Sequence, residues 1–136
     1  GMLSGCCLAA KGLQPNIRIF AAEPLGADDC ARSMKEGKML DQTSPNTIAD
    51  GLRTGLGTLT WPVIRDNVEE VITVTEEEIV SAMRLVYMRM KLVIEPSAAV
   101  GVAVALSDRF KALEGINKVG IVICGGNVDI DKFPWL

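Results

Sequence analysis

Histidine is absent from the 136 residues of this chain. Acid–base catalysis by imidazole is therefore excluded for the chain by itself, and so is every zinc site that needs an imidazole ligand. Four cysteines are present, but no pair of them has the C-x-x-C spacing. We therefore expect reduced thiols in a cytoplasmic protein.

Long apolar runs and basic clusters are also lacking. Charge, glycine or proline interrupts every apolar run before it reaches the roughly 18 residues that a membrane span needs. Lysine and arginine number 14 against 17 acidic residues, which gives a net charge of -3, and the basic residues are scattered. This pattern offers no electrostatic footprint for nucleic acid or an anionic membrane surface, so we expect neither as a partner.

The chain does have the material for a core, because 49% of its residues are hydrophobic and 23% are charged. This size and composition predict one globular domain over residues 1–136. Helical and strand patterns alternate along it, separated by glycine and proline. The expected elements are a helix over 2–12, a strand over 17–23, a helix over 28–38, a loop over 39–60, a helix that begins at Pro62 and a strand over 71–74.

The second half of the chain carries a clear helix start signal. Thr75 and Glu78 fit a capping box, and apolar residues then recur at helical spacing, which predicts a helix of about four turns: Ile79, Met83, Val86 and Met90. A mostly buried helix is expected over 96–110, and the apolar, β-branched run within 118–127 suits a buried parallel strand. The pattern predicts a three-layer α/β domain with a mainly parallel sheet, in which ligands bind beyond the carboxyl ends of strands.

Two stretches near expected strand ends contain residues with chemical potential. "CGGN" at 124–127 would let a ligand approach bare backbone, although a two-glycine turn is often only a turn. "AAEPLGADD" places Glu23, Asp28 and Asp29 between a strand and a helix. These carboxylates could cap the helix N-terminus, or they could supply oxygen ligands to magnesium or calcium.

Two further stretches are open to a structural and a functional interpretation. Glu95 in "IEPSAAVG" lies between two apolar helices, where an ionised carboxylate is costly unless it is paired or near a ligand. Capping of the following helix by Ser97, with Pro96 at its start, is the structural alternative. "TIADG" at 47–51 is either an ordinary Asp-Gly turn or part of a site.

Five segments occur together in the order and spacing of one known family: "AAEPLGADD", "NTIADGL", "WPVIRD", "IEPSAAVG" and "GGNVDI". In this respect the chain resembles the pyridoxal 5′-phosphate-dependent serine racemase and dehydratase family of fold type II, over essentially its whole length. The resemblance implies the C-terminal portion of a large domain like that of tryptophan synthase β. It also implies racemisation of serine, dehydration of serine to pyruvate and ammonia, and a homodimer.

The same resemblance assigns roles to individual residues. The cofactor would contact Gly1, as the remnant of a phosphate-binding tetraglycine loop, the loop residues Asp50 and Gly51, Glu95 near the ring and Cys124 at the ring nitrogen. A divalent cation, Mg²⁺ or alternatively Ca²⁺ or Mn²⁺, would be held by Glu23, Asp29 and the carbonyl oxygen of Ala27. Lys91 and Asn127 match residues that help to hold ATP at a dimer interface in some members.

The resemblance also identifies what this chain does not contain. The lysine that carries the cofactor, the serine on the opposite face of the substrate and the loop that binds the substrate carboxylate belong to upstream motifs absent here. No catalytic residue is therefore expected in residues 1–136, and we expect no turnover by the chain alone. The alternatives are a naturally truncated, non-catalytic module that binds metal or dimerises, and an unrelated nucleotide-binding domain, for which no phosphate-cradling glycine motif is found.

Overall fold

The computed structural model describes residues 1–133 and residue 135, and it is built around two parallel strands. β1 (Phe20–Pro24) pairs with β2 (Glu70–Val74) in a register that places Phe20 opposite Glu70 and Pro24 opposite Val74. The predicted α/β fold with a parallel sheet is confirmed. β1 begins three residues later than expected and includes Pro24, which the sequence suggested as a break.

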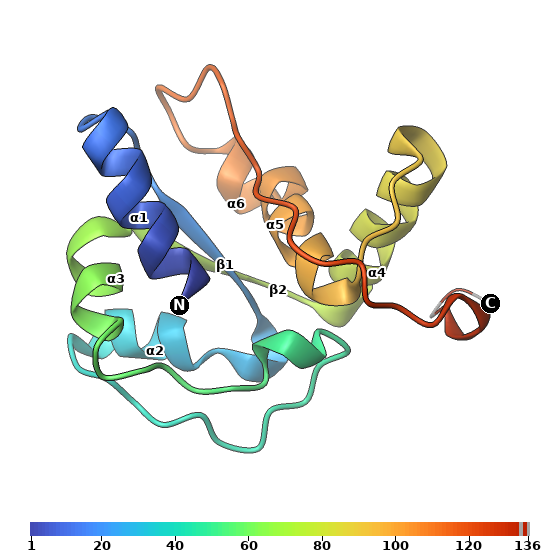
Figure 1. The fold of residues 1–136 in the computed structure, drawn as a ribbon, viewed down its shortest axis with the longest axis horizontal. Coiled ribbons are helices and arrows are strands. Elements are labelled where there is room, and N and C mark those ends of the chain that lie inside the picture. The colour runs from blue at the N-terminus through green and yellow to red at the C-terminus, as the bar shows by residue number, and fades with distance from the viewer. Residues whose placement is uncertain (134, 136) are drawn as a thin grey trace.

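Helices cover both faces of this sheet (Figure 1). On one face lie α1 (Met2–Leu13), α2 (Asp29–Glu36) and α3 (Trp61–Asn67). Their shared apolar cluster consists of Cys7, Ala21, Cys30, Ile64 and Val68. α4 (Glu76–Leu85) and α5 (Pro96–Leu106) cover the other face, where Ile72 and Val74 of β2 point. Alternate residues of each strand therefore enter opposite cores, which produces the three predicted layers.

The helix predicted after Thr75 is present, but its last turn is wider than expected. The capping box forms, with Thr75 Oγ1 accepting the Glu78 N–H at 3.3 Å and Glu78 Oε2 accepting the Thr75 N–H at 2.8 Å. α4 then continues into a π-helical turn, η3 (Val86–Met90), which ends at Lys91 with a positive φ of 59°. Periodicity predicted the extent of this helix and could not reveal a change of hydrogen-bond pattern within it.

Aromatic side chains fasten the C-terminal residues to this π-helical turn. Tyr87 lies edge-on to Phe133 and Trp135, with ring centroids 5.0 and 5.6 Å away. Its hydroxyl donates a hydrogen bond to the carbonyl oxygen of Ile94 at 3.1 Å. The π-helical turn, the rings of Phe133 and Trp135 and the segment before α5 are thus joined through the Tyr87 side chain.

The single helix predicted over 96–110 is two helices. α5 ends at Leu106, and α6 (Asp108–Lys111) follows. Ser107 separates them, because its hydroxyl accepts the Phe110 N–H at 3.2 Å and donates to the Val104 carbonyl oxygen at 2.7 Å. A serine that caps a new helix ends the preceding one.

The predicted final strand was wrong for the described residues. Residues 118–127 run extended beside α5 without a strand ladder, and Val119, Ile121 and Val122 are 51%, 39% and 60% exposed. The composition suits a buried strand, but a ladder needs a neighbouring strand, and β1 and β2 pair only with each other. Hydrogen bonding from the Glu95 N–H to the Gly125 carbonyl oxygen, at 3.2 Å, holds the end of the segment instead.

The remaining short elements lie in connections. They are the 3-10 turns η1 (Leu25–Ala27), η2 (Asp50–Leu52) and η4 (Ile130–Lys132). α1 runs one residue past Gly12, and its C-cap is Gln14, whereas α2 ends as expected at Gly37 with φ 68°. Within the described part of the chain, no helix has the length and apolar character needed to cross a membrane.

The long connection between α2 and α3 is tied to the loop after β1. Asn46 donates its N–H to the carbonyl oxygen of Gly26 at 2.8 Å, and a Cβ at Gly26 would overlap the Asn46 carbonyl group. Only glycine permits this close approach of two backbones.

We therefore expect Gly26→Ala to lower the free energy of unfolding by about 1–3 kcal/mol, because the backbone must shift to accept the methyl group. Urea unfolding followed by the fluorescence of buried Trp61 measures this change. Gly5→Ala is the matched control: its Cβ would meet nothing within 4 Å in α1, and alanine in a helix interior should stabilise by about 0.5–1 kcal/mol. Equal stability of Gly26→Ala and the unsubstituted chain would contradict the close approach.

Candidate functional site

One cavity brings together most of the residues singled out in the sequence. It has a volume of about 1040 Å³ and lies between residues 17–23, which include all of β1 except Pro24, and the extended residues 116–122. The predicted site residues on its wall are Gly1, Glu23, Asp29, Gly51, Glu95 and Cys124. Ala27, Asp50, Lys91 and Asn127 lie outside this lining. The predicted cofactor and cation positions therefore share one space.

The N-terminus of α1 forms one part of the wall. Gly1 is the N-cap residue, and its carbonyl oxygen accepts the Gly5 N–H at 3.0 Å and the Ser4 hydroxyl at 2.9 Å. Met2 and Leu3 also line the cavity. N–H groups in the first turn of a helix have no intrahelical acceptor, and the helix dipole adds partial positive charge there. This part of the wall suits a phosphate group.

Glu95 and the glycine turn at 124–127 form a second part. The Glu95 carboxylate accepts the Asn127 N–H at 2.9 Å. Gly125 has φ 93°, and a Cβ built on it would lie 2.5 Å from the Glu95 carboxylate. The turn after Cys124 is therefore packed directly on Glu95, and its bare backbone is required by that contact.

The 47–51 loop forms a third part, and its contact partner was not expected. The Gly51 N–H donates to the Ser97 hydroxyl at 3.1 Å, and a Cβ at Gly51 would lie 3.0 Å from the same oxygen. The interpretation of Ser97 as the helix cap was wrong, because Glu95 is the N-cap residue of α5 and makes no side-chain cap bond. Asp50 points its carboxylate back to the Gly51 N–H at 2.9 Å and is exposed.

The Glu23 and Asp29 carboxylates lie side by side under the end of β1. Glu23 is 8% exposed and accepts the N–H groups of Cys30 and Ala31 at 3.1 and 2.8 Å, so it caps α2 from the preceding strand. Asp29 is 2% exposed and accepts from the Gln42 amide at 2.8 Å and the Leu56 N–H at 3.2 Å. The capping interpretation thus holds for Glu23, whereas Asp28 pairs with Arg32 at 2.8 Å.

Burial dominates the electrostatics of this pair. Desolvation raises the pKa of Glu23 to about 7, against the opposing effect of the Ala31 and Cys30 N–H groups. Desolvation also raises the pKa of Asp29, while the Leu56 N–H lowers it. The neighbouring Cys30 thiol has its pKa raised to about 12, first by burial and then by the two carboxylates. Two buried carboxylates side by side are costly without a cation.

The atoms of Glu23 and Asp29 that could bind a metal ion are carboxylate oxygens. Each carboxylate oxygen accepts one N–H and retains a second lone pair. Ala27, whose carbonyl oxygen was predicted as the third ligand, is 1% exposed at the end of η1. Across residues 1–133 and 135, no group of three or more acidic or cysteine side chains is arranged to hold a metal ion. A cation here would need backbone and water oxygens to complete its shell.

The two residues predicted for ATP lie away from the cavity wall. Lys91 ends the π-helical turn, and its Nζ donates to the Met88 carbonyl oxygen at 2.7 Å. Asn127 takes part in the glycine turn through its backbone N–H. Nothing in these contacts tests a nucleotide site, and the assignment stays a prediction.

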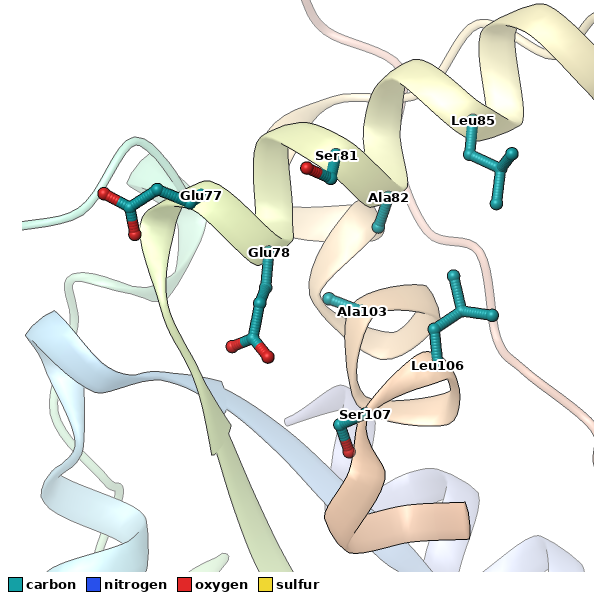
Figure 2. Close-up of a pocket in the computed structure, with 8 residues that line it drawn as sticks. All are labelled: Glu77, Glu78, Ser81, Ala82, Leu85, Ala103, Leu106 and Ser107. Carbon is teal, nitrogen blue, oxygen red and sulfur yellow. The ribbon is translucent and has the colours of Figure 1, made fainter.

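A second, smaller hollow of about 450 Å³ lies between α4 and the end of α5. Figure 2 shows Leu85 and Leu106 pointing toward one another across it, with the Glu77 carboxylate at the far end of α4. Its floor is formed by small side chains, Ala82 and Ala103. None of the residues predicted for a cofactor, metal or nucleotide lines this hollow.

Sequence reasoning missed two residues of the cavity region. Cys30 lines the cavity beside the carboxylate pair, and Ser97 holds Gly51 from 46 residues away. Cys30 is part of an ordinary amphipathic helix pattern, and Ser97 follows a proline at a helix start. No local signal separates either residue from a purely structural one.

Comparison with known proteins finds similar enzymes. The model of the family described as pyridoxal-phosphate dependent enzyme matches residues 1–125. Serine racemase of Dictyostelium discoideum is 56% identical over 134 residues, which are 97% of this chain and 41% of that protein. The structure of maize serine racemase aligns with a TM-score of 0.93 at 53% identity, over 96% of this chain and 40% of that one.

A pyridoxal 5′-phosphate-dependent aspartate racemase is also similar, with a TM-score of 0.89 and 42% identity over 99% of this chain and 43% of that one. The chain thus spans about two fifths of the length of these relatives. Their structures confirm the predicted fold class, that of the fold-type II enzymes. With the family model matched over residues 1–125, the chain belongs to the pyridoxal-phosphate dependent enzyme family.

Proposed function

We propose that this chain is the C-terminal portion of a pyridoxal 5′-phosphate-dependent serine racemase that also dehydrates serine to pyruvate and ammonia. The observation that carries the proposal is the single cavity that joins the N-terminus of α1, Gly51, Glu95 and Cys124. The names and the identities of the relatives support serine as the substrate. Because the chain spans only about two fifths of those proteins, the complete activity would need the rest of the polypeptide.

Each wall of the cavity suits one part of the cofactor. The free N–H groups of α1 would bind the phosphate. The half-buried Cys124 thiol would face the ring nitrogen and, unlike a carboxylate, would not favour its protonation. Gly51 and Gly125 have no Cβ, which keeps Ser97 and Glu95 in van der Waals contact with backbone and leaves the ring face open. When bound, the cofactor stabilises negative charge that develops at the substrate α-carbon.

The carboxylate pair supports a divalent cation, Mg²⁺, Ca²⁺ or Mn²⁺, as part of the proposal. A cation would neutralise two desolvated carboxylates and would tie β1 to the start of α2 through Glu23 and Asp29. We also propose a homodimer with ATP near Lys91 and Asn127, in a cytoplasmic protein. These assignments follow from the resemblance and have no contact in this structure that carries them.

A non-catalytic module is the second candidate, and the carboxylate pair is the observation that favours it. Glu23 and Asp29 are both buried and lie side by side, so that one cation would neutralise both. Such a module would bind a divalent cation or dimerise without turnover.

Cofactor binding separates these functions. A longer polypeptide that contains this chain and supplies the lysine should bind pyridoxal 5′-phosphate, shift its visible absorption on addition of serine, and release D-serine and pyruvate. Gly125→Ala should weaken cofactor binding by roughly tenfold or more, which corresponds to about 1.4 kcal/mol, because its Cβ collides with Glu95.

Gly12→Ala is the control for that substitution, since Gly12 lies outside the cavity lining and its Cβ would meet nothing within 4 Å. Residues 1–136 alone should release no pyruvate from serine. A longer polypeptide that binds the cofactor and racemises aspartate but not serine would overturn the substrate, and one that never binds the cofactor would favour the non-catalytic module.

Cation binding can be measured on the chain itself. Adding Mg²⁺, Ca²⁺ or Mn²⁺ at about one hundred times its dissociation constant should raise the melting temperature by on the order of 10 °C, and a chelator should reverse the shift. Glu23→Gln should abolish the shift by removing one charge from the pair. Asp28→Asn should retain it, because Asp28 pairs with Arg32. A shift of the same size in both variants would rule out this site.

A further inference from the structure

We propose that Glu76, in the first turn of α4, is a positioning residue that fixes the 47–51 loop at the edge of the cavity. The proposal rests on the proposed function only in that this loop, through Gly51, would contact the cofactor. The contact itself is independent of any ligand: the Glu76 Oε2 accepts the Ile48 N–H at 2.8 Å, across 28 residues of sequence.

The loop is suspended between two helices by side-chain acceptors. Glu76 of α4 holds the Ile48 N–H, and Ser97 of α5 holds the Gly51 N–H at 3.1 Å. Asp50 lies between these two fixed amides. Because the two acceptors come from different helices of one core, the orientation of the peptide units between Ile48 and Gly51 depends on both bonds.

Internal bonds shape the loop but do not attach it to the fold. The Thr47 hydroxyl accepts the Ala49 N–H at 3.1 Å, and the Arg53 guanidinium donates to the Thr47 carbonyl oxygen at 2.9 and 2.5 Å. These bonds remain inside residues 47–53. At its start the loop is attached by the neighbouring Asn46 N–H, which donates to Gly26 at 2.8 Å. Between Asn46 and Gly51, the hydrogen bond from the Ile48 N–H to Glu76 is the one that attaches the loop to the side chain of another element, among the described residues.

The placement of Glu76 is not explained by helix capping. Thr75 and Glu78 already form the complete capping box of α4. Glu76 Oε1 is buried and has no hydrogen-bond partner within the described part of the chain, while Oε2 bonds the loop. A carboxylate with one buried oxygen left without a donor is a poor stabiliser. The orientation of the Glu76 side chain is instead explained by the hydrogen bond that its Oε2 accepts from the Ile48 N–H.

The helix that carries Glu76 is rigid enough to serve as a support. Ile79 and Met83 of α4 are fully buried in the main core, and Ile48 packs against the same core. A carboxylate in a helix first turn is also favoured electrostatically by the helix dipole. Glu76 therefore presents a fixed acceptor, and the loop takes its position from it.

Hydrogen exchange of the purified chain tests this without a cofactor. In Glu76→Ala, exchange at the Ile48 amide, read from peptides covering residues 44–53, should rise by roughly tenfold or more, as expected for loss of a hydrogen bond to a charged group. Glu76→Gln should restore most of the protection, because its amide oxygen can accept the same N–H. Ser97→Ala should leave Ile48 protected, and it should raise exchange at Gly51 only modestly, because Asp50 Oδ1 also accepts that N–H at 2.9 Å.

Glu77→Ala is the matched control, since Glu77 is an exposed neighbour in the same turn and, among the described residues, no hydrogen bond joins its side chain to the loop. Urea unfolding of each variant gives the global stability. Glu76→Ala could raise exchange throughout the chain by lowering its global stability. In that case Glu76→Gln and Glu77→Ala are compared, and protection of the Ile48 amide in both variants supports the proposal. Unchanged exchange at Ile48 in a folded Glu76→Ala, or loss of protection in Glu76→Gln, would overturn it.

A second measurement separates this inference from the proposed function. In the longer polypeptide, Glu76→Ala should weaken pyridoxal 5′-phosphate binding while Glu76→Gln should not. If no variant and no unsubstituted protein binds the cofactor, the proposed function fails, and the exchange data still decide whether Glu76 positions the loop.

Discussion

Parallel pairing of β1 with β2 is the constraint on which the rest of the structure depends. Because the strands run the same way, with Glu23 opposite Thr73 and Pro24 opposite Val74, both carboxyl ends reach the same edge of the sheet. At this edge β1 leads through η1 into α2, which begins at Asp29, and β2 leads into the capping box and Glu76. Groups that are about 50 residues apart in sequence are thereby brought to one side of the molecule.

The second requirement is that other groups, one of them backbone and two of them side chains, approach glycine backbone closely at this edge. Gly26 lies against Asn46, Gly51 against Ser97, and Gly125 against Glu95. A Cβ added at any of the three glycines would lie closer to the neighbouring atom than an ordinary van der Waals contact. Three loops from different parts of the chain can therefore share a narrow space around the cavity. Backbone N–H donors hold them, with side-chain acceptors for Gly51 and Asn127 and a backbone carbonyl acceptor for Asn46.

Local sequence signals predicted the elements whose cause is local. The capping box at Thr75 and the short apolar run of β2 could be identified because helix capping and strand propensity act over a few residues. The local sequence of residues 118–127 could not show whether they form a strand, since a strand needs a neighbouring strand to pair with. Ser97 was misassigned for a related reason: the N–H that its hydroxyl accepts lies 46 residues earlier, and nothing in the neighbouring sequence indicates that contact.

The aromatic contacts of Tyr87 link the C-terminal residues to the acid at the cavity. Its ring packs on Phe133 and Trp135, and its hydroxyl bonds the carbonyl oxygen of Ile94, directly before Glu95. The packing of Phe133 and Trp135 on Tyr87 therefore bears on the backbone that carries Glu95, although neither ring lines the cavity.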